Sequence, residues 1–276
     1  MEINDKHIIK GIGENYIDTH KNKDGFKPNL PDTIIIHYTA GSSGKSSAKY
    51  LARPDVKASA HIVIDRSGEI WQLVPFDTKA WHAGKSEFDG RKYYNQYSIG
   101  IELDNVGWVE KNGTDFYSPA TGQKILTQDV VLRTHRNEHT NRYWQTYTPQ
   151  QLSICKELCQ SLISKYGIRS ILGHEEISPG RKTDPGPAFP LDKFREELLL
   201  GNRDQEQDEN SDVPEGIVTA TLLNVRKGPG IEYGKLAQQL RKNQKVTISE
   251  SRNGWYKVQD NPIGWVFSQY INLVDY

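Results

Sequence analysis

Short apolar runs that end in a histidine occur twice in the chain. Residues 33–36, Thr-Ile-Ile-Ile, are mostly β-branched and lead directly into His37. Residues 170–173, Ser-Ile-Leu-Gly, lead in the same way into His174. An apolar run without polar alternation is typical of a strand that is covered on both faces of a sheet. The pattern therefore predicts two buried strands, each followed by a histidine.

Two further patterns predict a hairpin and a strand with one polar face. Residues 61–64 and 69–74 are mainly apolar and flank a turn that contains Gly68, which is typical of a β-hairpin. In residues 98–103 the apolar side chains alternate, and successive side chains of a strand point to opposite faces of its sheet. We therefore expect Glu102 to point away from the apolar face in the middle of this strand.

A long amphipathic helix is predicted in the second half of the chain. Thr148 is followed by a proline and, three residues later, by Gln151, which is the pattern of a capped helix start. Apolar residues then recur at helical spacing until Gly167, a typical helix-ending residue. Cys155 and Cys159 lie on the apolar stripe, so we expect buried, unreactive thiols.

Two shorter helices complete the first two hundred residues. Residues 41–52 change from small polar residues to helix formers, and a last helix is predicted over about residues 192–200. Gly44-Lys45-Ser46 is similar to the end of a phosphate-binding loop, but Thr39 stands where that loop needs its first glycine. We therefore expect no nucleotide site here. Strands mixed with helices predict a layered α/β domain.

The pattern of the last sixty residues predicts a separate all-β domain. Short apolar runs lie between turns that recur about every ten residues, which is typical of a small barrel. Trp255 and Trp265 lie in two of these runs, and they either face a ligand or fill the core. Both interpretations are compatible with the sequence.

The charges divide the chain into three parts. The formal net charge is 0, but residues 1–200 carry +1, residues 201–216 carry −5 and residues 217–276 carry +4. The middle segment has few apolar residues and no aromatic ones, so it cannot bury enough surface to fold alone. We expect an acidic, flexible linker between two domains. No part has the strong basic excess that is typical of duplex nucleic-acid binding, so we expect no nucleic-acid partner.

Membrane and export signals are not apparent in the sequence. No apolar run approaches the about 18 residues that a membrane helix requires, so we expect no transmembrane segment. The first residues contain no apolar stretch typical of a secretory leader. Only two cysteines are present, which excludes a disulfide-dependent scaffold but leaves the redox compartment open. The cellular location therefore stays undetermined at this level.

Three residues stand out as a candidate metal site. His37 and His174 follow predicted strands, and Asp184 lies ten residues after His174 in a loop rich in proline and glycine. Two imidazoles and a carboxylate, with water in the fourth position, would form a catalytic zinc site. Lys182 is two residues before Asp184 and could face an oxyanion beside the metal. From spacing alone, structural histidines and a turn-forming aspartate remain open alternatives.

A family resemblance strengthens this interpretation. The chain resembles the zinc-dependent N-acetylmuramoyl-L-alanine amidases of the type-2 class, which include phage lysozyme-like amidases and relatives of the peptidoglycan recognition proteins. The resemblance spans about residues 30–200 and is carried by five segments in the family's order: IIIHYTAG (34–41), ASAHIVIDRSGEIWQLV (58–74), AWHAGKS (80–86), SIGIELDN (98–105) and GHEEISPGRKTDPGPAF (173–189).

The resemblance implies a mixed central β-sheet flanked by helices, with Zn²⁺ at one end of a substrate groove. By position, His37, His174 and Asp184 would be the zinc ligands, Glu102 the general base and Lys182 a stabiliser of the oxyanion. The phage branch has a catalytic tyrosine where this chain has an alanine, so that role would fall to Glu102 or be absent.

The remaining histidines carry weaker expectations. His61 and His82 lie in family-like segments and are candidate substrate-binding residues of the groove, with a structural role as an equal alternative. His135 and His139 are spaced by four residues, but their surroundings do not match a metal motif, and we expect them to be exposed. They belong to residues 106–147, which match the family poorly and could form an insertion over the groove.

The C-terminal segment LNVRKGP, with Trp255 and the later Gly-Trp-Val, resembles a bacterial SH3-like domain. The resemblances together imply a peptidoglycan hydrolase of lysin or wall-hydrolase type. It would cleave the amide between the lactyl group of N-acetylmuramic acid and L-alanine, and its C-terminal domain would contact the cell wall. Two alternatives remain: a peptidoglycan-binding recognition protein without turnover, or a zinc peptidase acting within the stem peptide.

Overall fold

The computed structural model of the protein describes all residues except 201–214, 231–232, 253–254, 261 and 275–276. The chain forms two compact units, Met1–Gln205 and Glu206–Tyr276. Of the predicted linker, residues 201–216, residues 201–214 lie outside the described residues. The last two linker residues, 215 and 216, are the first residues of a strand. Within the described part of the chain, no helix combines the length and apolar character needed to span a bilayer.

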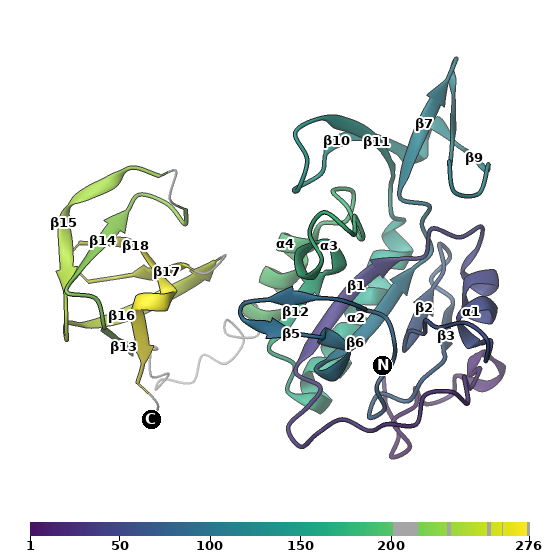
Figure 1. The fold of residues 1–276 in the computed structure, drawn as a ribbon, viewed down its shortest axis with the longest axis horizontal. Coiled ribbons are helices and arrows are strands. Elements are labelled where there is room, and N and C mark those ends of the chain that lie inside the picture. The colour runs from purple at the N-terminus through teal and green to yellow at the C-terminus, as the bar shows by residue number, and fades with distance from the viewer. Residues whose placement is uncertain (201–214, 231–232, 253–254, 261, 275–276) are drawn as a thin grey trace. The chain divides into compact units, whose positions relative to one another are not determined.

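A five-stranded sheet forms the centre of the first unit (Figure 1). Its strands are β1 (Thr33–Tyr38), β2 (Ile62–Ile64), β3 (Ile70–Gln72), β6 (Ser98–Leu103) and β12 (Ser170–Gly173). Their order is β12-β1-β6-β2-β3, and all neighbours pair in parallel except the β2–β3 hairpin. The predicted strands and hairpin, and the mixed α/β fold class, are confirmed.

The helix α2 (Pro149–Tyr166) covers one face of this sheet. Its apolar stripe, which includes Cys155 and Cys159, packs against isoleucines of β1 and β6. The Thr148 hydroxyl accepts a hydrogen bond from the Gln151 amide at 3.1 Å, and Gly167 ends the helix at φ 65°. The predicted caps and the two buried, free cysteines are therefore confirmed.

Shorter helices cover the opposite face. They are α1 (Gly44–Ala52) and α3 (His174–Ile177), whereas α4 (Leu191–Arg195), which continues into a π-helical turn at Glu196–Leu200, packs through Leu191 and Phe194 in the same core as α2. Ala48 of α1 packs on Val63, and Ile177 of α3 packs on Ile35 and Leu172. Single 3₁₀ turns occur at Gly13–Asn15, Tyr94–Gln96, Thr127–Asp129 and Ser268–Tyr270. This second face carries the candidate site.

Residues 106–147 form an additional sheet of their own (Figure 1). Its strands are β7 (Trp108–Asn112), β8 (Asp115–Tyr117), β9 (Lys124–Ile125), β10 (Val130–Thr134) and β11 (Asn141–Gln145), in the order β10-β11-β7-β8-β9. The sheet has its own small core around Val109 and Phe116. It joins the domain at Gly107, which has φ +77° and where a Cβ atom would lie 2.6 Å from the Tyr38 ring.

The second unit is all-β, as predicted. Its strands are β13 (Glu215–Val218), β14 (Leu222–Arg226), β15 (Lys235–Arg241), β16 (Lys245–Arg252), β17 (Trp255–Val258), β18 (Gly264–Phe267) and β19 (Ile271–Leu273). They are ordered β15-β14-β18-β17-β16-β13-β19 around an aliphatic core. Trp255 and Trp265 are both 7% exposed, but neither belongs to this aliphatic core, so their burial does not decide between the core and the ligand-facing interpretation. The first unit also contains a small hairpin, β4 (Glu87–Phe88) with β5 (Arg91–Lys92).

Candidate functional site: a His-His-Asp corner in an open pocket

Two central strands place a histidine and a carboxylate side by side. β1 and β6 run in parallel, and His37 lies opposite Glu102 in their register. Because side chains alternate along a strand, Ile36 and Ile101 point to α2 while His37 and Glu102 point to the other face. This region near the carboxyl ends of parallel strands is where ligand sites of such sheets usually form. The sequence pattern predicted this position of Glu102 correctly.

The neighbouring strand and the loop after it supply two more candidate ligands. β12 ends at Gly173, so His174 begins α3 at the same edge of the sheet. The Glu175 amide donates to the Asp184 carbonyl at 2.7 Å, and the Tyr147 hydroxyl donates to the Pro185 carbonyl at 2.7 Å. The first bond holds the proline-rich loop against α3 and the second holds it against the segment before α2, so that Asp184 lies beside His174.

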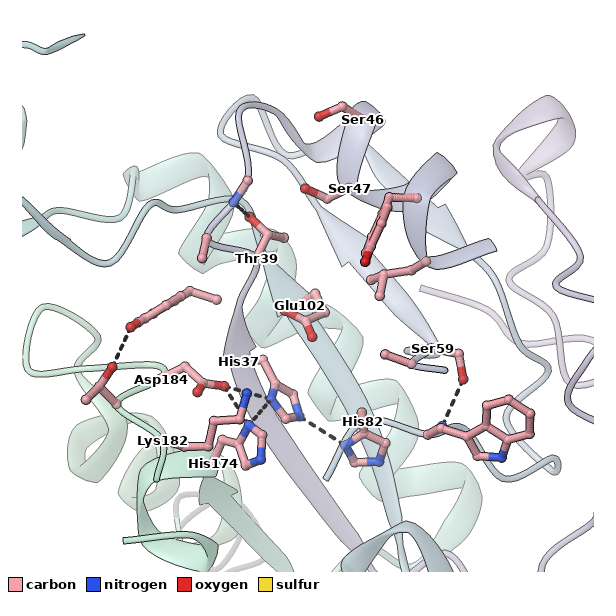
Figure 2. Close-up of a pocket in the computed structure, with 18 of the residues that line it drawn as sticks. His37, Thr39, Ser46, Ser47, Ser59, His82, Glu102, His174, Lys182 and Asp184 are labelled. Carbon is pink, nitrogen blue, oxygen red and sulfur yellow. Dashed lines mark hydrogen bonds and ion pairs between the residues drawn. The ribbon is translucent and has the colours of Figure 1, made fainter. Parts of the chain in front are cut away.

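Three donor atoms converge at this corner of the pocket (Figure 2). His37 Nδ1 lies 2.9 Å from His174 Nδ1 and 2.8 Å from Asp184 Oδ2, and His174 Nδ1 lies 2.9 Å from the same oxygen. All three residues are buried, and their donor atoms lie within 4.8 Å of one another. Two imidazole nitrogens and a carboxylate oxygen this close together are a donor set that fits a transition-metal ion.

The outer ring nitrogens of both histidines are held by hydrogen bonds. His174 Nε2 lies 3.1 Å from the Ala83 carbonyl, which only accepts, so the tautomer with its proton on Nε2 fits this contact and leaves the lone pair of Nδ1 free. His82 Nε2 donates in the same way to the Ser98 carbonyl at 3.2 Å, which makes His82 Nδ1 an acceptor. That acceptor lies 3.0 Å from His37 Nε2. These contacts match the tautomers in which the two metal-facing Nδ1 atoms carry no proton, as coordination requires.

The electrostatics of the corner favour the same protonation states. Burial, and next the neighbouring His174, lower the pKa of His37 to about 4, although Asp184 acts to raise it. Burial acts to raise the pKa of Asp184, but the adjacent imidazoles of His174 and His37 outweigh it and hold that pKa below its ordinary value. A neutral imidazole and an ionised carboxylate are the forms that bind metals.

Glu102 lies beside this corner with an unsatisfied oxygen. Within the described part of the chain, its Oε2 atom is buried and has no hydrogen-bond partner. Burial, and next the charge of Asp184, raise the pKa of Glu102 well above its ordinary value, while Lys182 acts to lower it. Figure 2 shows Lys182 beside the His-His-Asp corner and Glu102 on the far side of His37. A carboxyl group with a raised pKa in a pocket is typical of acid–base catalysis.

The corner opens into a pocket with a volume of about 730 Å³. One wall carries His37, His174 and Asp184 with Glu102 and Lys182. The rest of the lining includes polar, aromatic and aliphatic residues of α1 and the loops around it: Thr39, Ser42, Ser46, Ser47, Tyr50, Leu51, Ala58, Ser59 and Trp81. No residue of 106–147 lines this pocket, so the pocket lining does not support the expectation that this stretch lies over the groove.

Of the two candidate substrate-binding histidines, only His82 reaches the pocket wall. His61 is fully buried, its Nε2 atom lies 2.9 Å from the Thr78 carbonyl, and its Nδ1 atom accepts from the Gly100 amide at 2.9 Å. Both nitrogens are used by the backbone, so the structure corrects the expectation that His61 lines the groove. His82 bonds to His37, which is a supporting role that sequence reasoning missed.

His135 is also placed differently from expectation. It is 1% exposed, stacks on Trp144 and lies with Nε2 2.5 Å from Glu175 Oε2. The expectation of an exposed side chain is therefore wrong for His135, although it is correct for His139. The partner carboxylate is forty residues away in sequence, and no local pattern indicates the pairing.

Comparison with known proteins finds two family matches. Residues 27–187 match the model of the N-acetylmuramoyl-L-alanine amidase family, and residues 221–272 match that of the bacterial SH3 domain. The first match contains every residue of the candidate corner. The second lies within the all-β unit.

Individual relatives agree with the first match. The N-acetylmuramoyl-L-alanine amidase AmiD of Escherichia coli is 30% identical over 200 residues, which cover 68% of this chain and 61% of AmiD. The 1,6-anhydro-N-acetylmuramyl-L-alanine amidase AmpD of Escherichia coli is 37% identical over 142 residues, which cover 51% of this chain and 58% of AmpD. The chain thus spans about three fifths of the length of these relatives.

A solved structure of Escherichia coli AmiD, in complex with anhydro-N-acetylmuramic acid-L-Ala-D-γ-Glu-L-Lys, is similar as well. Its sequence is 31% identical, the TM-score is 0.46, and the match covers 61% of this chain and 57% of that one.

Proposed function

The chain belongs to the N-acetylmuramoyl-L-alanine amidase family, and from this premise we propose that it hydrolyses peptidoglycan at the amide between the lactyl group of N-acetylmuramic acid and L-alanine. The observation that carries the proposal is the pocket in which His37, His174 and Asp184 converge beside Glu102. AmiD and AmpD are named as amidases of N-acetylmuramyl-L-alanine and of its 1,6-anhydro form.

The metal in this proposal is Zn²⁺, held by His37 Nδ1, His174 Nδ1 and Asp184. Three protein ligands that face an open pocket leave a fourth position for water or substrate, which is the arrangement of catalytic zinc sites. When bound, zinc supplies a Lewis acid that polarises the scissile carbonyl and lowers the pKa of water to about 7. The protein contributes the fixed imidazole tautomers that keep the donor atoms ready.

Glu102 serves as the general base and then as the general acid. Its unsatisfied oxygen and its position beside His37 allow it to take a proton from the attacking water. Its raised pKa favours holding that proton until the leaving amine of L-alanine accepts it. One carboxyl group can therefore serve both proton transfers.

Lys182 stabilises the negative charge that develops on the carbonyl oxygen. It lines the pocket next to Asp184, and its charge acts on both His37 and Glu102. An ammonium group placed at a developing oxyanion contributes most in a pocket from which water is partly excluded.

We further propose that residues 1–200 form the catalytic domain, 201–216 an acidic tether and 217–276 a domain that binds the cell wall, with β13 extending it to Glu215. The match to a bacterial SH3 domain and the net charge of +4 support a role in contacting an anionic wall polymer. Sedimentation of the full chain with purified sacculi, at low and high salt, tests this role.

Mass spectrometry of digested peptidoglycan tests the activity and separates the alternatives. Release of intact stem peptides with free L-alanine amino termini is expected. Fragments cut within the stem would indicate a zinc peptidase, and binding with unchanged sacculi would indicate a recognition protein without turnover. His174→Ala and chelation of the metal should each abolish release, and full activity in either would overturn the site assignment.

A further inference from the structure

A single lysine behind the pocket wall is surrounded by backbone carbonyls. Lys21 lies in the segment before β1, and its Nζ atom is 2.8 Å from each of four carbonyl oxygens. These belong to Leu51, Arg53, Val56 and Ala58, which all lie in one eight-residue stretch after the middle of α1. We refer to Lys21 and these four carbonyls as the carbonyl cage.

The cage has the chemistry of a cation site. An ammonium group has three N–H donors, so four equidistant acceptors surround its charge instead of pairing one by one with its protons. Rings of backbone carbonyls are also how proteins hold bare monovalent cations. Leu51 is in the last turn of α1, where carbonyls lack helical partners and carry the negative end of the helix dipole. The ammonium group of Lys21 therefore acts as a covalently attached cation that holds these four carbonyl oxygens close together.

The caged stretch continues into the wall of the pocket. Leu51, Ala58 and Ser59 all line the pocket. The Ser59 amide donates to the Trp81 carbonyl at 3.1 Å, and the Trp81 amide donates to Ser59 Oγ at 2.8 Å. Lys21 Nζ also lies 6.0 Å from the centre of the Trp81 ring, which is 42% exposed in the pocket. One cation thus supports both the backbone and the aromatic side chain of this wall.

The wall is separate from the reacting groups. Figure 2 shows Ser59 on the side of the pocket away from Asp184 and Lys182. Lys21 touches neither the His-His-Asp corner nor Glu102. A change in the cage should therefore alter how the pocket receives its ligand without altering the metal ligands or the base.

We propose that Lys21 is a positioning residue for substrate binding, which holds the wall formed by Leu51, Ala58, Ser59 and Trp81 in its binding shape. The ligand of that wall is the muramyl peptide of the proposed function, on which this part of the inference rests. The cage itself is independent of that function.

Steady-state kinetics on a soluble N-acetylmuramyl peptide test the role. Lys21→Ala should raise KM about tenfold and leave kcat within about twofold, because binding is lost equally in the ground and transition states. Zinc affinity should be unchanged. Lys23→Ala removes the same charge from an exposed position in the same segment and serves as the control with wild-type KM. An unchanged KM in Lys21→Ala, or a parallel loss of kcat and zinc affinity, would overturn the proposal.

Chemical rescue separates the cage from a merely structural lysine. In Lys21→Ala the missing part of the side chain corresponds to propylammonium, which should restore KM, and K⁺ should restore it in part. Lys21→Met fills the space of the aliphatic part of the lysine side chain but carries no charge. The KM of this variant should also be raised, but it should not respond to propylammonium. If Lys21→Ala does not fold, Lys21→Met still tests the KM effect. Failure of propylammonium to restore a folded Lys21→Ala contradicts the cage.

Hydrogen exchange gives a result that does not depend on the reaction. The Val56 and Ser59 amides are hydrogen-bonded within the caged stretch and its wall. They should exchange about tenfold faster in Lys21→Ala than in the wild type and slow again with propylammonium. If the wild type does not cleave muramyl peptides but this exchange pattern holds, the proposed function fails while the cage stands. Unchanged exchange would overturn the cage even in an active amidase.

Discussion

His37 Nε2 lies 3.0 Å from His82 Nδ1, and this bond orients a candidate metal ligand from a segment forty-five residues away. His82 is in turn fixed by the Ser98 carbonyl, and Gly100 packs so closely on its ring that a Cβ atom would lie 2.4 Å from His82 Cγ. These contacts fix the orientation of the His37 ring and favour the tautomer with its proton on Nε2. Supporting bonds of this kind contribute substantially to metal affinity.

Replacement of His82 should weaken metal binding. His82→Phe keeps a ring but removes the acceptor for His37 Nε2, and we expect zinc affinity to fall about 10- to 100-fold. Competition with a fluorescent chelator measures this loss. His139→Phe, at an exposed position, is the matched control and should bind zinc like the wild type. Wild-type affinity in His82→Phe would show that the bond to His37 does not support the site.

Replacement of Glu102 should remove turnover and leave the metal in place. Glu102→Gln keeps the shape of the side chain but cannot take a proton, so kcat should fall about 10²- to 10⁴-fold. Metal content by atomic absorption should match that of the wild type. Retention of near wild-type kcat would exclude Glu102 as the base.

The same variant should be more stable than the wild type in the metal-free protein at neutral pH. Burial and the charge of Asp184 raise the folded-state pKa of Glu102, so ionisation is favoured more in the unfolded chain than in the folded one. Wild-type stability is therefore lost as pH rises above the ordinary pKa of a glutamate, and Glu102→Gln avoids this loss. The melting temperature of Glu102→Gln should equal that of the wild type near pH 4 and exceed it at pH 7. An equal difference at both pH values would show that ionisation of Glu102 is not the cause.

Replacement of Lys182 should lower kcat more than it raises KM. Lys182→Ala removes a cation from the pocket wall next to Asp184, and we expect a loss of about 10²- to 10³-fold in kcat. Lys182→Arg keeps the charge and should recover part of it. Lys57→Ala, at an exposed position outside the pocket, is the control. A change in KM alone would assign Lys182 to substrate binding instead.

The two cysteines should be unreactive in the folded protein. Both lie buried in the α2 core, and burial, together with the neighbouring Cys155, raises the pKa of Cys159 well above its ordinary value. Thiolates are the reactive form, so a thiol reagent should modify neither residue until the protein unfolds. Titration in denaturant, where both should react, is the control. Rapid labelling of the native protein would contradict the placement of α2.

Local patterns determined much of the fold and of the corner. The β-branched run before His37, the alternation around Glu102 and the Thr148–Gln151 cap each depend on residues a few positions apart, and each appears in the structure as predicted. For His37, His174 and Asp184 the spacing leaves structural roles open and the family resemblance implies the ligand set, and the structure brings the three residues together. Such features can be inferred from sequence because strand alternation and helix capping depend on residues only a few positions apart in the chain.

The tertiary structure alone decided which histidines serve the site. His61 and His82 lie in equally family-like segments, yet the backbone uses both nitrogens of His61 and leaves His82 to hold His37. The burial of His135 against Glu175 and the cage around Lys21 likewise join segments thirty or more residues apart. A hydrogen bond depends on position and direction within a few tenths of an ångström, and for distant segments these are set only when the sheets and helices pack.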